Sequence, residues 1–423
     1  PCQVRIIEVP PAIHGRFPNA EALPLFQMIA KNVGIRRARG RFVLATNIDI
    51  LFSDELMHFL KGGGLRPGKM YRIDRTDVDA GVPVDAPVEQ QLAYCRGRQI
   101  RLSCRYGHYL LDPTGCIAPE ADDIVGDGVA LKMGFYPVAH DFTGRTYRWC
   151  GEEAVIVVRP GAEPAPCRLC VELEPGPCLK RVPFLMRVED GRGGLVGEGF
   201  VGSHGIVSVP VTCRPNVETA LRFRPLSERR PRRDDYRSLD LRVYRVGLAP
   251  GDGDPFRFDP LRQGAVWRNA VRAVGRAVRR LWDRRFMPCG MHVGACGDFT
   301  LMAREDWLDL RGYPEFPVYS LNLDTLLCWQ AIYAGIEEVV LEPPMRAYHI
   351  DHSSGATPEG EKELLERVAT RGIPVMSAAQ LYEHVRRVAR NPRGHPFNGD
   401  DWGMRDLPLL ETRVGTTGSG MVA

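Results

Sequence analysis

The feature that most constrains the fold is a series of short apolar segments between residues 152 and 250, with Gly and Pro between them. In order they are EAVIVVRP, CRLCVELEP, VPFLMRVED, GLVGEGFVG, GIVSVPV, TALRFRPL and LDLRVYRVGL. Short strands at regular spacing, separated by turn residues, are typical of an all-β sandwich. The sequence therefore predicts a β-sandwich insertion at residues 151–255.

On both sides of this segment, predicted strands alternate with predicted helices. Upstream we expect strands at CQVRIIEVP, RFVLATNID and KMYRIDRTDV, and helices at ALPLFQMIAKNVGIRRA and SDELMHFLKGG, the second with Ser53 as its N-cap. Such alternation predicts a parallel sheet wrapped by helices. We therefore expect one α/β domain in two parts, 1–150 and 287–400, followed by a tail at 401–423.

A basic amphipathic helix is predicted at residues 256–286. One stripe carries apolar side chains and the other face carries arginines, with the apolar members being Trp267, Val271, Val274, Val278 and Leu281. A helix of this kind can make a peripheral membrane contact through residues 262–285, or hold a phosphorylated ligand. The alternative is that its apolar stripe packs on a neighbouring domain, and this is the default for surface helices.

Composition excludes several classes of protein. No apolar run in the 423 residues approaches the roughly 18 that a membrane span needs. A net charge of +4 argues against nucleic acid as a partner. The 12 cysteines are scattered, which favours reduced thiols in a cytoplasmic protein. A zinc site at Cys167, Cys170 and Cys178 is a weaker interpretation, because no second close pair follows.

Polar groups end the apolar strand RFVLATNID. Asn47 and Asp49 lie two residues apart, so both side chains can point the same way from an extended backbone. Ligands bind at such strand ends in α/β sheets. A carboxylate there can hold a hard divalent cation, and an amide can bond to sugar hydroxyls. The alternative is an Asp that merely caps the next helix.

Four segments together resemble a known family: KNVGIRRARGRFVLATNID, DWLDLRGYPE, YSLNLDTLLCWQAIYAG and YHIDH. They are similar to nucleotide-sugar glycosyltransferases of the GT-A fold, of the inverting family-two type. The resemblance covers residues 3 to about 80 and 290 to about 355. It implies a Rossmann-like, three-layer α/β/α domain, here split by the sandwich.

The resemblance also implies an activity: a sugar passes with inversion from a nucleotide-diphosphate sugar to a glycan or lipid-linked acceptor, in polysaccharide biosynthesis on the cytoplasmic side. It implies a divalent cation, Mn²⁺ or Mg²⁺. The implied roles are as follows: catalytic, Asp324 and Glu315; donor-binding, Asn32, Asn47, Asp49, Asp74 and Arg75; acceptor-binding, Asp298 and Tyr313; metal-binding, Asp49, His349 and His352.

Elementary chemistry is compatible with these roles, because inverting transfer needs a carboxylate base and positive charge at the leaving group. Two alternatives stay open. A catalytically inactive GT-A-like protein that binds glycans or acts as a scaffold is suggested by Asn47 and Leu323, which stand where the family has acidic residues. A hydrolase with paired carboxylates ranks last. Asp324 could also be only a helix cap, and Asp298 and His292 only structural groups.

Overall fold

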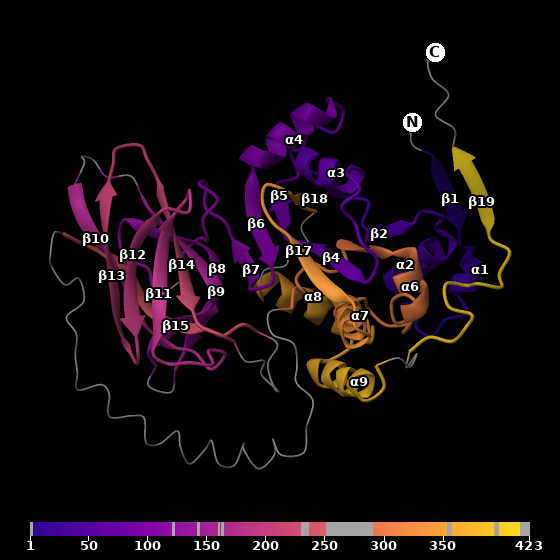
Figure 1. Ribbon diagram of the computed structural model, residues 1–423. Coiled ribbons are helices and arrows are strands. Elements are labelled where there is room, and N and C mark those ends of the chain that lie inside the picture. The colour runs from indigo at the N-terminus through magenta and orange to yellow at the C-terminus, as the bar shows by residue number, and fades with distance from the viewer. Residues whose placement is uncertain are drawn as a thin grey trace. The chain divides into compact units, whose positions relative to one another are not determined.

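The computed structural model (Figure 1) contains two compact units. Unit 1 comprises Pro1–Arg75 and Ala295–Ala423, and unit 2 comprises Thr76–Gly294. The residues that the structure describes are 3–120, 123–141, 144–159, 161, 165–229, 237–250, 291–352, 358–392 and 397–414. The predicted basic helix at 256–286 lies outside them.

Unit 2 is built around an eight-stranded antiparallel sheet in the order β12-β11-β14-β9-β15-β10-β13, with β8 beside β9. The strands are β8 (Val129–His140), β9 (Thr146–Val158), β10 (Ala165–Pro175), β11 (Phe184–Asp190), β12 (Leu195–Val201), β13 (Gly205–Cys213), β14 (Thr219–Leu226) and β15 (Leu241–Pro250). Every strand that the sequence predicted between residues 152 and 250 is thus confirmed.

The sheet curls back on itself. Its end strands β12 and β13 lie so close that Val209 Cγ1 is 2.9 Å from the position a Cβ on Gly197 would take. The enclosed face carries one apolar core, to which nearly every strand of the sheet contributes. Buried residues alternate with more exposed ones along β11 and β14, as expected for strands that cover a core with one face.

Unit 2 also contains a helix and a hairpin that precede the sandwich strands. These are α4 (Val88–Gly97) and the antiparallel pair β6 (Gln99–Cys104) and β7 (Gly107–Leu110). Cys104, Tyr106 and Tyr109 belong to the same core as the sandwich residues. The unit therefore begins at Thr76, although the sequence assigned residues up to 150 to the first part of the α/β domain.

Unit 1 has a four-stranded sheet in the order β17-β4-β16-β2. Its strands are β2 (Phe42–Thr46), β4 (Lys69–Ile73), β16 (Phe299–Ala303) and β17 (Glu337–Leu341). β17 is parallel to β4, but β16 is antiparallel to both β4 and β2. The predicted parallel, Rossmann-like sheet is therefore wrong, because a buried strand from the second part of the chain lies between β2 and β4 and runs the opposite way.

Two strand pairs lie outside this sheet in unit 1. β1 (Val4–Glu8) pairs with β19 (Leu410–Val414), and β3 (Ile50–Phe52) pairs with β18 (Ala347–Ile350), both antiparallel. The helices are α1 (Pro11–His14), α2 (Gln27–Arg37), α3 (Asp54–Lys61), α6 (Arg304–Leu310), α7 (Leu323–Tyr333), α8 (Pro358–Thr370) and α9 (Ala378–Arg390). The predicted cap of α3 is confirmed, since Ser53 Oγ accepts the Leu56 N–H at 3.3 Å.

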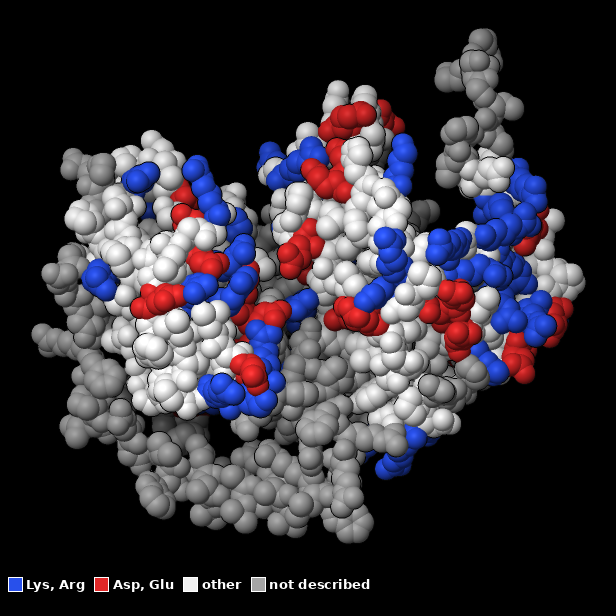
Figure 2. All heavy atoms as spheres, in the orientation of Figure 1, with Lys and Arg blue, Asp and Glu red and all other residues white. Residues whose placement is uncertain are grey.

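Charged side chains of both signs are spread over the visible face of unit 1, and basic residues gather around β1 and β19 (Figure 2). Arg5 pairs with Glu411, and Arg37 donates to the Gly403 and Met404 carbonyls at 2.7 Å. These arginines tie β1 and α2 to the segment between Gly403 and Glu411. Within the described part of the chain, no helix has both the length and the apolarity to cross a membrane.

Candidate functional site

The centre of the candidate site is the turn that follows β2. Asn47 Nδ2 donates to Asp298 Oδ1, and Asn47 Oδ1 accepts from Gln27 Nε2 at 3.0 Å. Asp298 also pairs with Arg75, with Nη1 and Oδ2 2.6 Å apart. The turn after β2, the residue before β16 and the first residue of β5 (Arg75–Val78) thus meet at one point.

Asp49 lies two residues further on and faces two histidines. Its Oδ2 is 3.3 Å from His349 Nε2 and 3.1 Å from His352 Nε2. His349 is buried on β18, whereas the His352 side chain is about half exposed. The ligand atoms of the three residues lie within 4.8 Å of one another. We call this group the Asp49 triad.

The Asp49 triad fits a divalent cation. Among the described residues Asp49 Oδ1 has no hydrogen-bond partner, although it is shielded from solvent. An unpaired buried carboxylate oxygen is costly unless a proton donor or a cation satisfies it. One carboxylate with two imidazoles suits first-row transition ions, whereas Mg²⁺ and Ca²⁺ prefer oxygen ligands throughout.

Lys31 on α2 is a cation that interacts electrostatically with Asp49 of the triad and with the carboxylates around Asn47. Burial lowers its pKa, and the negative charges of Asp298, Asp324 and Asp49 oppose that effect. Its ammonium group donates to the Gly297 carbonyl. One largely buried cation therefore shares its surroundings with three carboxylates. Sequence reasoning missed Lys31, because a lysine within a helix gives no signal until the sheet beneath it is known.

Asp324 lies beside Gly297 at the start of α7. A Cβ on Gly297 would be 3.0 Å from Asp324 Oδ2, so a side chain at this position would crowd the carboxylate. Asp324 Oδ1 accepts the N–H of Thr325 at 2.8 Å. The N-cap position of α7 belongs to Asn322, so Asp324 is not the cap. We call Gln27, Lys31, Asn47, Arg75, Asp298 and Asp324 the polar cluster.

Three predicted site residues form a separate, structural group. Asn32 is fully buried; its Nδ2 donates to the Tyr313 carbonyl at 2.8 Å and to Glu315 Oε1 at 2.9 Å, and its Oδ1 accepts the Tyr313 N–H at 2.8 Å. Glu315 Oε1 also accepts the Gly403 N–H at 2.8 Å. Burial raises the pKa of Glu315, against the hydrogen bond from Asn32. These contacts bind α2 to the chain after α6.

The remaining predicted residues are placed as follows. Asp74 is half-buried in unit 1, between β4 and Arg75. His292 is fully buried and belongs to unit 2.

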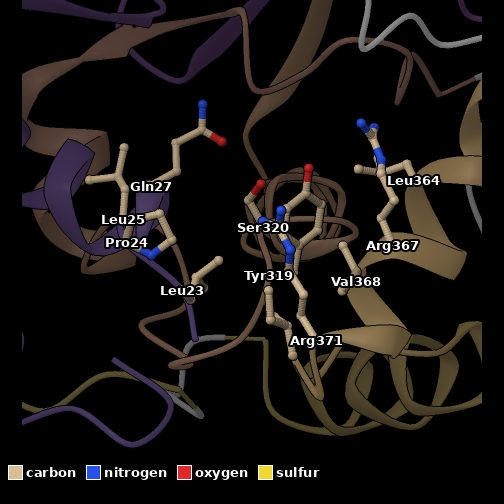
Figure 3. A pocket seen from close by; sticks show the side chains of 11 residues that line it. Leu23, Pro24, Leu25, Gln27, Tyr319, Ser320, Leu364, Arg367, Val368 and Arg371 are labelled. Carbon is tan, nitrogen blue, oxygen red and sulfur yellow. The ribbon is translucent and has the colours of Figure 1, made fainter. Parts of the chain in front are cut away.

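A pocket of about 350 Å³ opens next to the polar cluster (Figure 3). Gln27 is common to both, since it lines the pocket and also donates to Asn47. Tyr319, Ser320, Arg367 and Arg371 supply the other polar groups of the lining. The sequence did not single out this pocket, because its residues come from three distant segments.

Unit 2 carries an aromatic and charged face that sequence reasoning also missed. The Arg242 guanidinium lies over the rings of Tyr147 and Trp149, at 4.8 and 4.5 Å from their centroids. Tyr147 and Trp149 alternate along β9, and this alternation in TYRW was the available signal. Glu172, on β10, pairs with Arg145 and with His204.

No family model matches the chain, and no curated protein matches it. Solved structures that match include the C-terminal CBM6 of LamC from Zobellia galactanivorans, with 8% identity over 28% of this chain and 89% of that one, at a TM-score of 0.19. A CBM35 from Paenibacillus barcinonensis is 11% identical, and the match covers 30% of this chain and 94% of that chain at a TM-score of 0.20. A family 35 carbohydrate binding module from Clostridium thermocellum is 10% identical, and the match covers 29% of this chain and 92% of that chain at a TM-score of 0.20.

The expected membership of the GT-A glycosyltransferases is therefore wrong. No model of that family matches, and the solved structures named above are carbohydrate-binding modules. The sheet of unit 1 contains an antiparallel strand, although the alternation of strands and helices predicted a parallel sheet. The nucleotide-sugar donor, the inverting transfer and the role in polysaccharide biosynthesis were inferred from that resemblance and are withdrawn with it.

Proposed function

We propose that this protein binds glycans at the polar cluster of unit 1, with the help of a divalent cation held by the Asp49 triad. The observation that carries the proposal is the convergence of three carboxylates and the amide of Asn47 around the largely buried Lys31. A sugar hydroxyl both donates and accepts hydrogen bonds, so alternating acceptors and donors recognise it well.

Each part of the cluster has a role in this proposal. Asp298 and Asp324 would accept hydrogen bonds from sugar hydroxyls, and Lys31 and Asn47 would donate to them. Arg75 fixes the carboxylate of Asp298 through its ion pair. The cation on Asp49, His349 and His352 would supply a Lewis-acidic position for further hydroxyl oxygens.

The test is calorimetric titration of the full chain with a panel of oligosaccharides, with Mn²⁺ and with EDTA. We expect binding that EDTA weakens, because sugar hydroxyl oxygens would coordinate the cation. Asp49→Asn should have the same effect as EDTA. Asp309→Asn, which alters an exposed carboxylate on α6, is the matched control and should bind as the wild type does. Absence of binding across the panel, or binding that neither EDTA nor Asp49→Asn changes, would reject this proposal.

A further inference from the structure

The pocket beside the polar cluster has an apolar floor of a size that suits one sugar ring. Its apolar lining comes from Leu23, Pro24, Leu25, Leu364, Val368 and Ile373. Several of these side chains belong to one apolar core cluster, against which Tyr319 also packs. A volume of about 350 Å³ is near the lower end for small-ligand pockets. The C–H face of a sugar can pack on such a floor, and the Tyr319 ring adds an aromatic surface.

Two exposed arginines line this pocket. Arg367 and Arg371 are exposed, and neither forms an ion pair with any described residue. Both arginines line the pocket together with Tyr319, and the positive charge of Arg367 opposes the rise that burial causes in the pKa of Tyr319. Two guanidinium groups that have no carboxylate partner among the described residues, and that lie over an apolar floor, favour a ligand that carries negative charge.

The polar lining gives the pocket a direction. Figure 3 shows Gln27 and Arg367 on opposite sides, with Tyr319, Ser320 and Arg371 between them. Gln27 is also bonded to Asn47 of the polar cluster at 3.0 Å. A sugar in the pocket would therefore have its hydroxyls toward Gln27 and an anionic substituent toward the arginines.

We propose that this pocket binds an acidic sugar residue of the glycan, whose carboxylate or phosphate group contacts Arg367 and Arg371. The inference rests on the proposed glycan binding and specifies the class of ligand. Gln27 and Ser320 provide hydrogen-bonding groups for the sugar hydroxyls, and the apolar floor carries the ring. The shared chemistry is a sugar with one anionic group; a uronic acid and a phosphorylated sugar are its two sources.

The experiment uses the full chain in EDTA, so that an anionic sugar cannot bind through a cation. Glucuronate, glucose 6-phosphate, glucose and inorganic phosphate are titrated separately. We expect at least one acidic sugar to bind on the order of tenfold more tightly than glucose, since charge-assisted hydrogen bonds are stronger than neutral ones. The relative affinities of glucuronate and glucose 6-phosphate identify the source of the charge.

Variants then assign the effect to the pocket. Arg367→Gln combined with Arg371→Gln should reduce the acidic sugar to the affinity of glucose. Arg390→Gln, an exposed arginine on α9, is the control and should change nothing. Arg367→Lys should retain part of the preference, because it keeps the charge and loses the planar fork. Melting curves of all variants should match the wild type, since these side chains are exposed.

If the small ligands bind, any of three outcomes would overturn the inference. They are equal affinity for acidic and neutral sugars, an unchanged preference in the double variant, and inorganic phosphate binding as tightly as the sugar phosphate. If none of the four small ligands binds while oligosaccharides still do, the pocket inference fails and the proposed function stands. If oligosaccharides also fail to bind, the pocket inference and the proposed function are both wrong.

Discussion

At the scale of single residues, Glu172 shows how a carboxylate is kept charged on the aromatic face of unit 2. Burial disfavours its charged form, but hydrogen bonds from His204 and Arg145 outweigh this and lower its pKa from 4.5 to about 2. Because the pKa in the folded state lies below that in the unfolded chain, the stabilisation is complete above pH 4.5 and is lost as the pH falls towards 2.

We therefore predict an acid-induced loss of stability that depends on Glu172. The difference between the pKa of Glu172 in the unfolded chain and in the folded protein corresponds to about 3 kcal/mol in the free energy of unfolding. Urea unfolding of the wild type between pH 6 and pH 3 should show the midpoint decreasing below pH 4.5. Glu172→Gln should lack this component of the decrease, whereas Glu174→Gln, on the same strand but more exposed, should keep it. Parallel pH profiles for the wild type and Glu172→Gln would contradict the assignment.

Asn32 is the second residue whose environment yields a prediction. Asn32→Ala removes the partner of the buried Tyr313 N–H and one partner of the half-buried Glu315 carboxylate. Buried groups left without a partner cost free energy, so we expect a loss of about 3 kcal/mol in the free energy of unfolding. Asn391→Ala, at the exposed end of α9, should cost far less. Equal losses in denaturant titrations would show that the buried network is not what Asn32 supplies.

At the scale of elements, β8 depends on a glycine where it changes register against β9. Gly134 has φ +87°, and a Cβ there would lie 2.0 Å from the Glu153 carbonyl oxygen. The register shifts between Met133 and Phe135, the two residues that flank it, and again between Phe135 and Val138. Gly134→Ala therefore adds a steric clash to an unfavourable backbone conformation.

The matched comparison is Gly144→Ala, which has φ +81° but open space around the position of the added Cβ. We predict a loss of about 1 kcal/mol for Gly144→Ala and of more than about 2 kcal/mol for Gly134→Ala. Thermal melts of the two variants measure the difference. A similar loss in both would mean that β8 can shift to relieve the clash.

The sequence predicted elements better than it predicted their arrangement. The regular spacing of short apolar segments between turn residues located each strand between 152 and 250. Such a pattern does not give strand direction, so the antiparallel insertion of β16 between β2 and β4 was missed. In the site, the Asn47 and Asp49 step was visible at a strand end. Lys31 and the pocket arginines could not be identified from the sequence, since only the tertiary fold brings them to the polar cluster and the pocket.

At the scale of the whole molecule, each unit has a core of its own. Among the described residues, the large apolar cluster of unit 2 contains only members of Thr76–Gly294, and the two unit 1 clusters that include Leu56 and Phe26 contain none of them. The chain leaves unit 1 at Arg75 and returns at Ala295, and the Arg75 side chain pairs with Asp298 at 2.6 Å. The points at which the chain leaves and re-enters unit 1 are therefore close together, as expected where one domain is inserted into another.

This geometry predicts that unit 1 folds without unit 2. Replacing residues 76–294 by about eight Gly and Ser residues bridges the gap, since an extended chain spans roughly 3.3 Å per residue. The shortened protein should unfold cooperatively and bind Mn²⁺ with the affinity of the full chain, because Asp49, His349 and His352 all lie in unit 1. Adding Asp49→Asn to it should weaken Mn²⁺ at least tenfold. A shortened protein without a cooperative melt would mean that the folding of unit 1 requires unit 2, whereas a folded one that does not bind Mn²⁺ would show that the triad alone does not make the cation site.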